Sequence, residues 1–223
     1  ISTAEAKLRV IDTRKPLETL TVHVCEVVTG AIRQGASASI TVDAERRQKI
    51  VRNHTATHLL HAALRERLGE HVHQAGSAVR PEKLRFDFNH GEALSNEDIA
   101  WIEDRVNGWI KEAAPVRWIN MEKNEAEELG AMALFGEKYG DWVRVVEVES
   151  VSRELCGGTH VTNTAEIGIF RIISESSSSA NVRRIEAITG PDAIDWHRAR
   201  TGELFEVGEM LGDVRDPVGA ARR

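Results

Sequence analysis

The sequence predicts an α+β fold in which a mixed or antiparallel sheet packs with helices. Runs rich in β-branched residues and helix-like stretches follow one another irregularly, without the strict alternation that marks a parallel βαβ fold. Residues 43–68 contain neither glycine nor proline, whereas glycine or proline separates most of the shorter apolar runs. With 223 residues, 41% hydrophobic and 29% charged, the chain has the composition of an ordinary globular protein.

The first 44 residues are expected to form a small β unit. Two runs rich in valine, threonine, leucine and isoleucine flank Lys15-Pro16, which indicates a turn between two strands. Gly30 and Gly35 bracket a second turn. Because so small a unit buries little surface by itself, it is expected to lean on neighbouring structure. The expected strands are residues 7–11, 19–28 and 39–42.

The clearest helix in the sequence begins after Asp43, a good N-cap residue, and ends at Gly69. Several side chains recur near helical spacing within it: Ile50, His54, Thr57, His58, His61 and Leu64. Farther along, Ser95 and Asp98 resemble a capping box, and Pro115 ends the helix that they begin.

The rest of the chain mixes short strands and helices. Four serines, at positions 176–179, are expected to form the loose polar loop of a hairpin. The remaining expected elements are strands at 72–79, 84–88, 116–121 and 142–148, helices at 95–113 and 122–129, hairpin strands at 167–173 and 182–188, and a charged helix that begins at residue 192 and precedes Pro217.

Composition excludes several classes of protein. The net charge of −6 argues against a protein that coats nucleic acid through bulk electrostatics, so RNA binding would depend on local basic clusters. The chain has no run of eighteen apolar residues, which excludes a transmembrane helix. Its two cysteines, Cys25 and Cys156, lie far apart, so a disulfide framework is not expected and a reducing, cytoplasmic location is.

Four residues in two segments have the pattern of a metal site. His54 and His58 lie at i and i+4, on one face of the predicted helix. About a hundred residues later, Cys156 and His160 flank a glycine pair and a threonine. Three imidazoles and one thiolate in tetrahedral reach suit Zn²⁺. His61 is the competing candidate for a metal ligand, but its apolar neighbours in the sequence indicate that it packs in the core.

Two other uses of these residues stay open. Cys156, paired with a histidine, is conceivable as a nucleophile, although two further histidines for the same point favour metal ligation. A zinc ion with four protein ligands is normally structural, so catalysis would need a looser coordination or a substrate held beside the metal.

The sequence resembles the editing domain of alanyl-tRNA synthetases, a fold shared with the threonyl-tRNA synthetase editing domain and with free-standing alanyl-tRNA editing proteins. The resemblance covers residues 45–190. It rests on NHTATHLLH at 53–61, CGGTH at 156–160, RFDF at 85–88, GAMALFGEKY at 130–139, FRIISE at 170–175 and VRRIEA at 182–187.

The resemblance implies a zinc-dependent deacylase that hydrolyses serine or glycine from mischarged tRNA(Ala), with His54, His58, Cys156 and His160 as zinc ligands. It further implies that residues 1–44 are the remainder of a preceding β-barrel and that 191–223 begin a helical connection within a longer synthetase. The chain opens at Ile1, which also suggests a fragment, and it carries no aminoacylation motif.

Four further residues are candidates for contacting the substrate. Gln74 is expected to hydrogen-bond the carbonyl or amino group of the aminoacyl ester, and Thr55 to contact the serine hydroxyl. Arg183 and Arg184 are candidates for gripping acceptor-end phosphates, although Arg184 or Glu186 could equally form an ion pair between strands. No carboxylate stands out in the sequence as the base that activates water.

Two alternatives from other classes remain. The chain could be a free-standing trans-editing protein with the same chemistry. It could also be a tRNA-binding module that zinc stabilises without hydrolysis.

Overall fold

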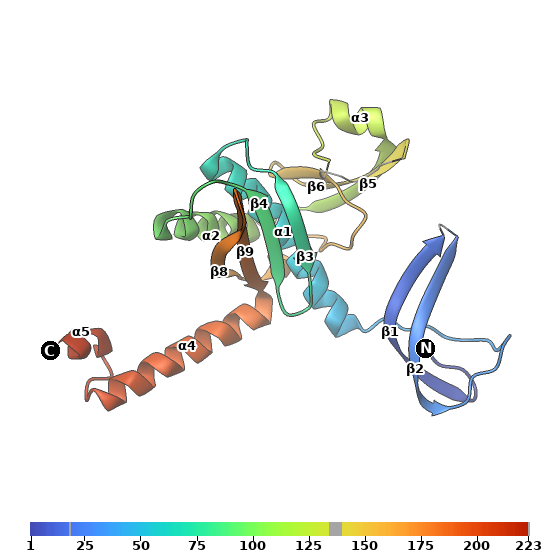
Figure 1. Ribbon diagram of the computed structural model, residues 1–223, viewed down its shortest axis with the longest axis horizontal. Helices are drawn as coiled ribbons and strands as arrows, with labels where there is room; N and C mark the ends of the chain where they lie inside the picture. The colour runs from blue at the N-terminus through green and yellow to red at the C-terminus, as the bar shows by residue number, and fades with distance from the viewer. Residues whose placement is uncertain (18, 134–139, 223) are drawn as a thin grey trace. The chain divides into compact units, whose positions relative to one another are not determined.

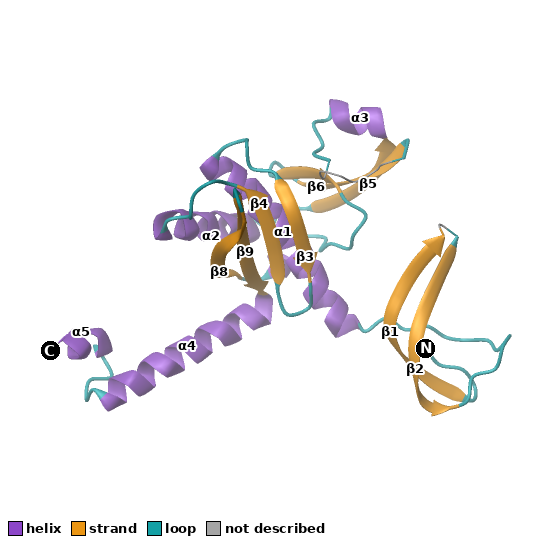
Figure 2. Ribbon diagram, in the orientation of Figure 1, coloured by secondary structure: helices purple, strands orange, loops and turns teal. Residues whose placement is uncertain are grey.

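The computed structural model describes residues 1–17, 19–133 and 140–222. The chain divides into two compact units, Ile1–Ala44 and Glu45–Arg223. Among these residues, no helix combines the length and the apolar character needed to cross a membrane. The elements are mixed helices and antiparallel strands, which confirms the α+β prediction (Figure 2).

The first unit is built on one antiparallel hairpin of β1 (Ala6–Leu17) and β2 (Leu20–Gly30). The predicted turn at Lys15-Pro16 is wrong, because β1 continues through Pro16 and Leu17 pairs with Leu20. The pairing register shifts just before Leu17, which accommodates the missing N–H of Pro16. The strand expected at residues 39–42 is also wrong, since Ser39 forms only a single bridge to Ser2.

The second unit is centred on α1 (Ala44–Leu68), the helix that the sequence predicts most clearly. A four-stranded antiparallel sheet packs against it, and α2 (Asn96–Lys111) lies on the same face of this sheet (Figure 1). In spatial order, the strands are β3 (Gln74–Val79), β4 (Leu84–Asn89), β9 (Val182–Thr189) and β8 (Phe170–Ser179).

The main core lies between this sheet and the two helices. Leu59, Leu60, Phe86 and Phe88 are fully buried in it. Burying one such side chain contributes about 1.5–3 kcal/mol. Every residue of α1 from position 55 to 61 is buried, so His58 and His61 are enclosed by packing, whereas His54 is only partly buried.

A three-stranded antiparallel sheet forms the other layer of this unit. It consists of β5 (Val116–Glu122), β6 (Trp142–Val148) and β7 (Ser152–Leu155), and α3 (Lys123–Glu128) packs beside it over a small second core. The sequence did not predict β7, which is only four residues long. This short strand ends immediately before Cys156.

The four serines at 176–179 were expected in a loop, and this expectation is wrong. They belong to β8, where Ser176 pairs with Arg184 and Ser179 with Val182. A tight turn suffices to reverse the chain because Asn181 adopts a positive φ of 58°. The other elements are the short 3₁₀ helix η1 (Thr164–Ile167), α4 (Gly190–Met210) and α5 (Pro217–Arg222).

Candidate metal centre and adjoining cavity

The structure brings the four predicted metal ligands together. His54 and His58 project from successive turns of α1, and Cys156 and His160 come from the loop after β7. One ligand atom from each of the four residues lies within 4.8 Å of every other. Sγ of Cys156 lies 3.4 Å from Nε2 of His54 and 3.3 Å from Nε2 of His160. A helix and a distant loop thus converge on one point.

The loop that carries Cys156 is anchored by Arg144 of β6. The backbone N–H of Cys156 donates to the carbonyl of Arg144 at 2.9 Å, which extends the sheet pairing into the loop. The Arg144 guanidinium donates in turn to the carbonyls of Cys156 and Gly158, at 3.4 and 2.5 Å. It also lies over the ring of Trp118, 5.3 Å from the ring centre. These contacts fix the backbone on which the thiolate and His160 depend.

Glycine is required at position 158 because it packs closely against the metal group, by which we mean the side chains of His54, His58, Cys156 and His160. A Cβ atom at this position would lie 2.0 Å from Cε1 of His54 and 2.5 Å from its Nδ1. A Cβ atom at the neighbouring Gly157 would have nothing within 4 Å. The glycine pair therefore contains one position where a side chain would displace a ligand and one where it would not.

Glu154 is a functional residue that the sequence reasoning missed. It is only 3% exposed, and its Oε2 lies 3.0 Å from Nδ1 of His58. Its Oε1 accepts from the hydroxyl of Ser152 at 2.9 Å. Because the carboxylate faces Nδ1 of His58, Nε2 is the nitrogen left to face a metal, and such outer carboxylates commonly orient metal-binding histidines. Strand alternation, which places Ser152 and Glu154 on one face of β7, was the available signal.

Electrostatics in the group favour the ligand forms of Cys156 and His160 but the protonated form of His58. Burial by itself would raise the pKa of the Cys156 thiol, but hydrogen bonds from His160 and the other histidines lower it to about 3. Burial lowers the pKa of His160 to about 4, so its imidazole is neutral. Burial would also lower the pKa of His58, but the Glu154 carboxylate and the Cys156 thiolate outweigh it and raise this pKa. A metal ion that binds here would displace the His58 proton.

The donor set fits a metal ion. Three imidazoles and one thiolate face a common point, and a buried carboxylate balances the positive charge that an ion would bring. This combination of nitrogen and sulfur ligands is typical of tetrahedral divalent metal sites. The group can therefore hold a metal ion.

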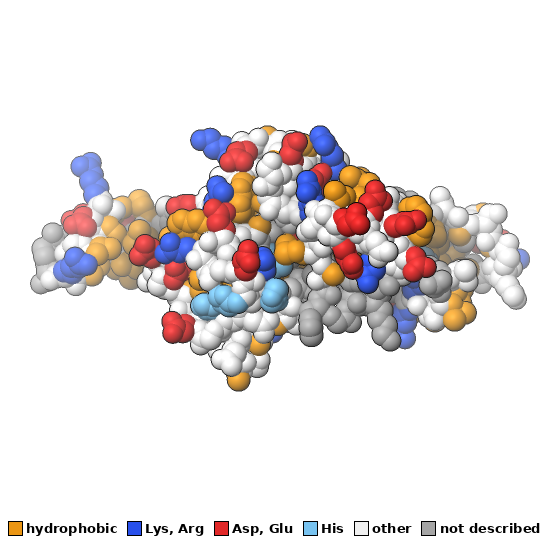
Figure 3. Space-filling model, turned by 90° about the horizontal axis from the view of Figure 1, so that it is seen from above, with side chains coloured by type: hydrophobic (Ala, Val, Ile, Leu, Met, Phe, Trp, Pro, Cys, Tyr) orange, Lys and Arg blue, Asp and Glu red, His pale blue; other side chains and the backbone are white. Residues whose placement is uncertain are grey.

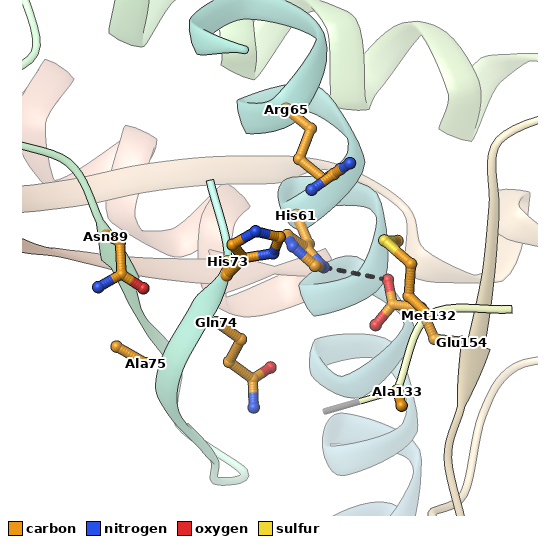
Figure 4. A pocket seen from close by; sticks show the side chains of 9 residues that line it. All are labelled: His61, Arg65, His73, Gln74, Ala75, Asn89, Met132, Ala133 and Glu154. Atoms are coloured by element: carbon orange, nitrogen blue, oxygen red, sulfur yellow. Dashed lines mark hydrogen bonds and ion pairs between the residues drawn. The ribbon is translucent and has the colours of Figure 1, made fainter. Parts of the chain in front are cut away.

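A cavity of about 780 Å³ adjoins the metal group. Figure 4 shows the side chains that line it, with Gln74 from β3 and His61 from α1 among them. Glu154 is part of its wall as well as the partner of His58. The cavity and the metal group therefore share one buried residue. The lining residues are His61, Arg65, His73, Gln74, Ala75, Asn89, Met132, Ala133 and Glu154.

Thr55 does not line this cavity. Its side chain has no exposed surface, and its hydroxyl lies 3.2 Å from Nδ1 of His160. The same hydroxyl donates to the carbonyl of Val51 at 3.1 Å and accepts from the backbone N–H of Val161 at 3.2 Å. These contacts place Thr55 behind a predicted metal ligand, where it orients His160.

Arg183 and Arg184 lie on β9 and are paired with carboxylates. Arg183 forms two hydrogen bonds of 2.6 Å with Glu175. Arg184 forms two with Asp87 of β4, at 2.7 and 2.8 Å, which is the ion pair between strands that the sequence analysis left open. Basic and acidic side chains are interspersed on the face seen in Figure 3.

Comparison with known proteins places these features in a family. Residues 143–186 match the family described as Threonyl and Alanyl tRNA synthetase second additional domain, a span that includes Cys156 and His160. Alanine–tRNA ligases give much longer matches. The relative from Thermotoga maritima is 52% identical over 199 residues, which cover 89% of this chain and 23% of the relative.

Two further alanine–tRNA ligases match in the same way. The one from Herpetosiphon aurantiacus is 50% identical over 216 residues, with 90% of this chain and 24% of the relative covered. The one from Clostridioides difficile is 49% identical over 209 residues, with 94% and 24% covered. The chain thus spans about a quarter of the length of these relatives. Of the segments that carried the resemblance, residues 134–139 lie outside the described part of the structure. The chain is therefore a member of the alanyl-tRNA synthetase family and corresponds to its editing-domain region.

Proposed function

We propose that this chain is a zinc-dependent deacylase that hydrolyses serine or glycine from mischarged tRNA(Ala). The observation that carries the proposal is a buried residue that a cavity shares with the metal group. Glu154 lies 3.0 Å from the ligand His58 and lines the 780 Å³ cavity that also contains Gln74. The relationship to alanine–tRNA ligases supplies the substrate class.

The need for such a site follows from the size of the amino acids. Alanine is intermediate between glycine and serine, and one methylene more or less changes binding by only about 1–3 kcal/mol. A second site that hydrolyses the wrong ester corrects the resulting errors. Hydrolysis requires a positioned water and stabilisation of the negative charge that develops on the ester carbonyl oxygen.

In this proposal, His54, His58, Cys156 and His160 hold Zn²⁺, whose nitrogen and sulfur preferences they match. A bound zinc ion supplies a Lewis acid that polarises an oxygen atom placed beside it. Gln74, in the cavity wall, donates a hydrogen bond to the carbonyl of the aminoacyl ester or accepts one from its amino group.

The acceptor end of tRNA(Ala) is the proposed macromolecular partner, and the rest of a synthetase in the cytoplasm is the proposed context. Arg183 and Arg184 remain candidates for contacting phosphates. Each guanidinium has five N–H donors, and the pairs with Glu175 and Asp87 occupy only some of them. A phosphate would then share the guanidinium with its carboxylate.

The substitution Cys156→Ala tests the proposal. It removes the only sulfur ligand of the group, so bound zinc is expected to be lost and deacylation of Ser-tRNA(Ala) to fall at least ~10²-fold. Zinc content by elemental analysis and a time course of deacylation measure the two effects. Cys25→Ala, in the other compact unit, is the matched control and should change neither. Full deacylation by metal-free Cys156→Ala would refute the mechanism.

One observation favours a second candidate, a tRNA-binding module in which zinc is only structural. Four protein ligands normally close a zinc site. Measuring tRNA affinity and deacylation rate with the same zinc-loaded preparation distinguishes the two candidates. A deacylase hydrolyses the ester, whereas the second candidate binds tRNA without deacylating it.

A further inference from the structure

His61 has a buried nitrogen that nothing in the described structure satisfies. The residue is 4% exposed and lines the cavity. Its Nδ1 lies 3.3 Å from Oε1 of Glu154, the contact drawn as a dashed line in Figure 4. Its Nε2 has no hydrogen-bond partner among the described residues. A buried polar atom without a protein partner at a cavity wall calls for an explanation, and a catalytic role is one.

The contact with Glu154 determines which ring nitrogen of His61 carries the hydrogen. An ionised carboxylate only accepts hydrogen bonds. Nδ1 is therefore the donor in this contact, and in the neutral form of an imidazole the other nitrogen, here Nε2, is an acceptor. This arrangement, a carboxylate that orients an imidazole whose other nitrogen is free, is the one that general bases use in hydrolytic enzymes.

We propose that His61 is the general base that activates the hydrolytic water, and that Glu154 positions it. The inference rests on the proposed deacylase function. As the water oxygen bonds to the ester carbonyl carbon, one water proton passes to Nε2 of His61. When the bond between that carbon and the ribose oxygen then breaks, the same proton passes from His61 to the departing ribose oxygen. The products are the free amino acid and the 3′-terminal hydroxyl, and no further reactant is needed.

Among the other polar residues of the cavity, Arg65, Gln74 and Glu154 fit this role less well, and His73 is exposed and has no carboxylate partner among the described residues to orient it. Arg65 has no acceptor, and its guanidinium already donates to the carbonyls of Glu70 and Val72. Gln74 has an amide, which does not take up a proton in neutral solution. Glu154 is engaged through both oxygens, by His58 on one side and by Ser152 and His61 on the other.

The substitution His61→Asn distinguishes the role of Nε2 from that of Nδ1. The asparagine amide can occupy the place of Nδ1 and keep a donor toward Glu154, while Nε2 disappears. Because a general base contributes about 10²–10⁴-fold, kcat for Ser-tRNA(Ala) deacylation should fall by that factor, with KM and zinc content close to those of the unsubstituted chain. His71→Asn, an exposed histidine outside the cavity lining, is the matched control and should retain full activity.

A second variant, His61→Ala, leaves room for added imidazole. Restored turnover on addition of imidazole would support the proposal, and no gain in a folded, zinc-loaded His61→Ala would overturn it. A His61→Asn variant with unchanged kcat, or with only a raised KM, would also overturn it and leave the deacylase function standing. An unsubstituted zinc-loaded chain without deacylation would overturn both.

Discussion

At the scale of single residues, the metal group depends on one position that must be glycine. Gly158 packs directly against the His54 ring, whereas Gly157 has open space around the position of a Cβ atom. The motif of two glycines therefore contains one steric requirement and one tolerant position. Sequence alone does not distinguish them.

The substitution Gly158→Ala should displace His54 and weaken metal binding by about 10–100-fold, the range found when the surroundings of a metal ligand are disturbed. Competition with a chromophoric chelator measures the affinity for zinc. Gly157→Ala should bind zinc as the unsubstituted chain does. Equal affinities for the two variants would contradict the close approach of Gly158 to His54.

At the scale of elements, α2 illustrates a local signal that the structure confirms. The Ser95 side chain accepts from the backbone N–H of Asp98, and the Asp98 carboxylate accepts from the backbone N–H of Ser95. Asp98 also pairs with Arg67 of α1 at 2.8 Å, so the cap ties the two helices together. The cap contributes to stability without touching the cavity.

Removing the cap with Ser95→Ala should therefore lower the free energy of unfolding by about 1 kcal/mol, with deacylation and zinc content unchanged. Urea denaturation measures this difference through the midpoint at constant slope. Ser95→Asn retains a side-chain acceptor at the cap and should lose only a few tenths of a kcal/mol. A Ser95→Ala chain as stable as the unsubstituted one would show that the cap is not a source of stability.

At the scale of the whole molecule, the metal group joins parts of the chain that are about a hundred residues apart. Two ligands come from α1 and two from the loop after β7. A metal ion that binds all four stabilises the folded form of the Glu45–Arg223 unit, because the unfolded chain does not hold these ligands together.

Removal of zinc by a chelator should lower the thermal transition of the chain, and added zinc should restore it. Free zinc at a hundred times its Kd contributes about 2.7 kcal/mol. Calorimetry with and without chelator measures the shift, and Cys156→Ala should respond to neither addition. A transition that zinc leaves unchanged in the unsubstituted chain would argue against metal binding at the four residues.

The sequence by itself determined the features that depend on local chemistry. The glycine- and proline-free stretch predicted α1, the capping box predicted the start of α2, and the residue types at 54, 58, 156 and 160 predicted a metal group. The two helix signals come from residues that are close together in the sequence. The metal signal comes from the preference of metal ions for imidazole and thiolate ligands. Where local signals were weak, as at Pro16 and in the serines of β8, strand pairing decided the outcome.

Only the tertiary structure decided which groups surround those ligands. Glu154 looked like an ordinary charged residue, and its importance comes from burial between His58 and His61. Thr55 is next to the predicted ligand His54 in the sequence, but its hydroxyl contacts Nδ1 of His160. Arg184 of β9 pairs with Asp87 of the neighbouring strand β4. Contacts of this kind join residues distant in sequence, and they exist only after α1, β7 and the sheets have packed around one core.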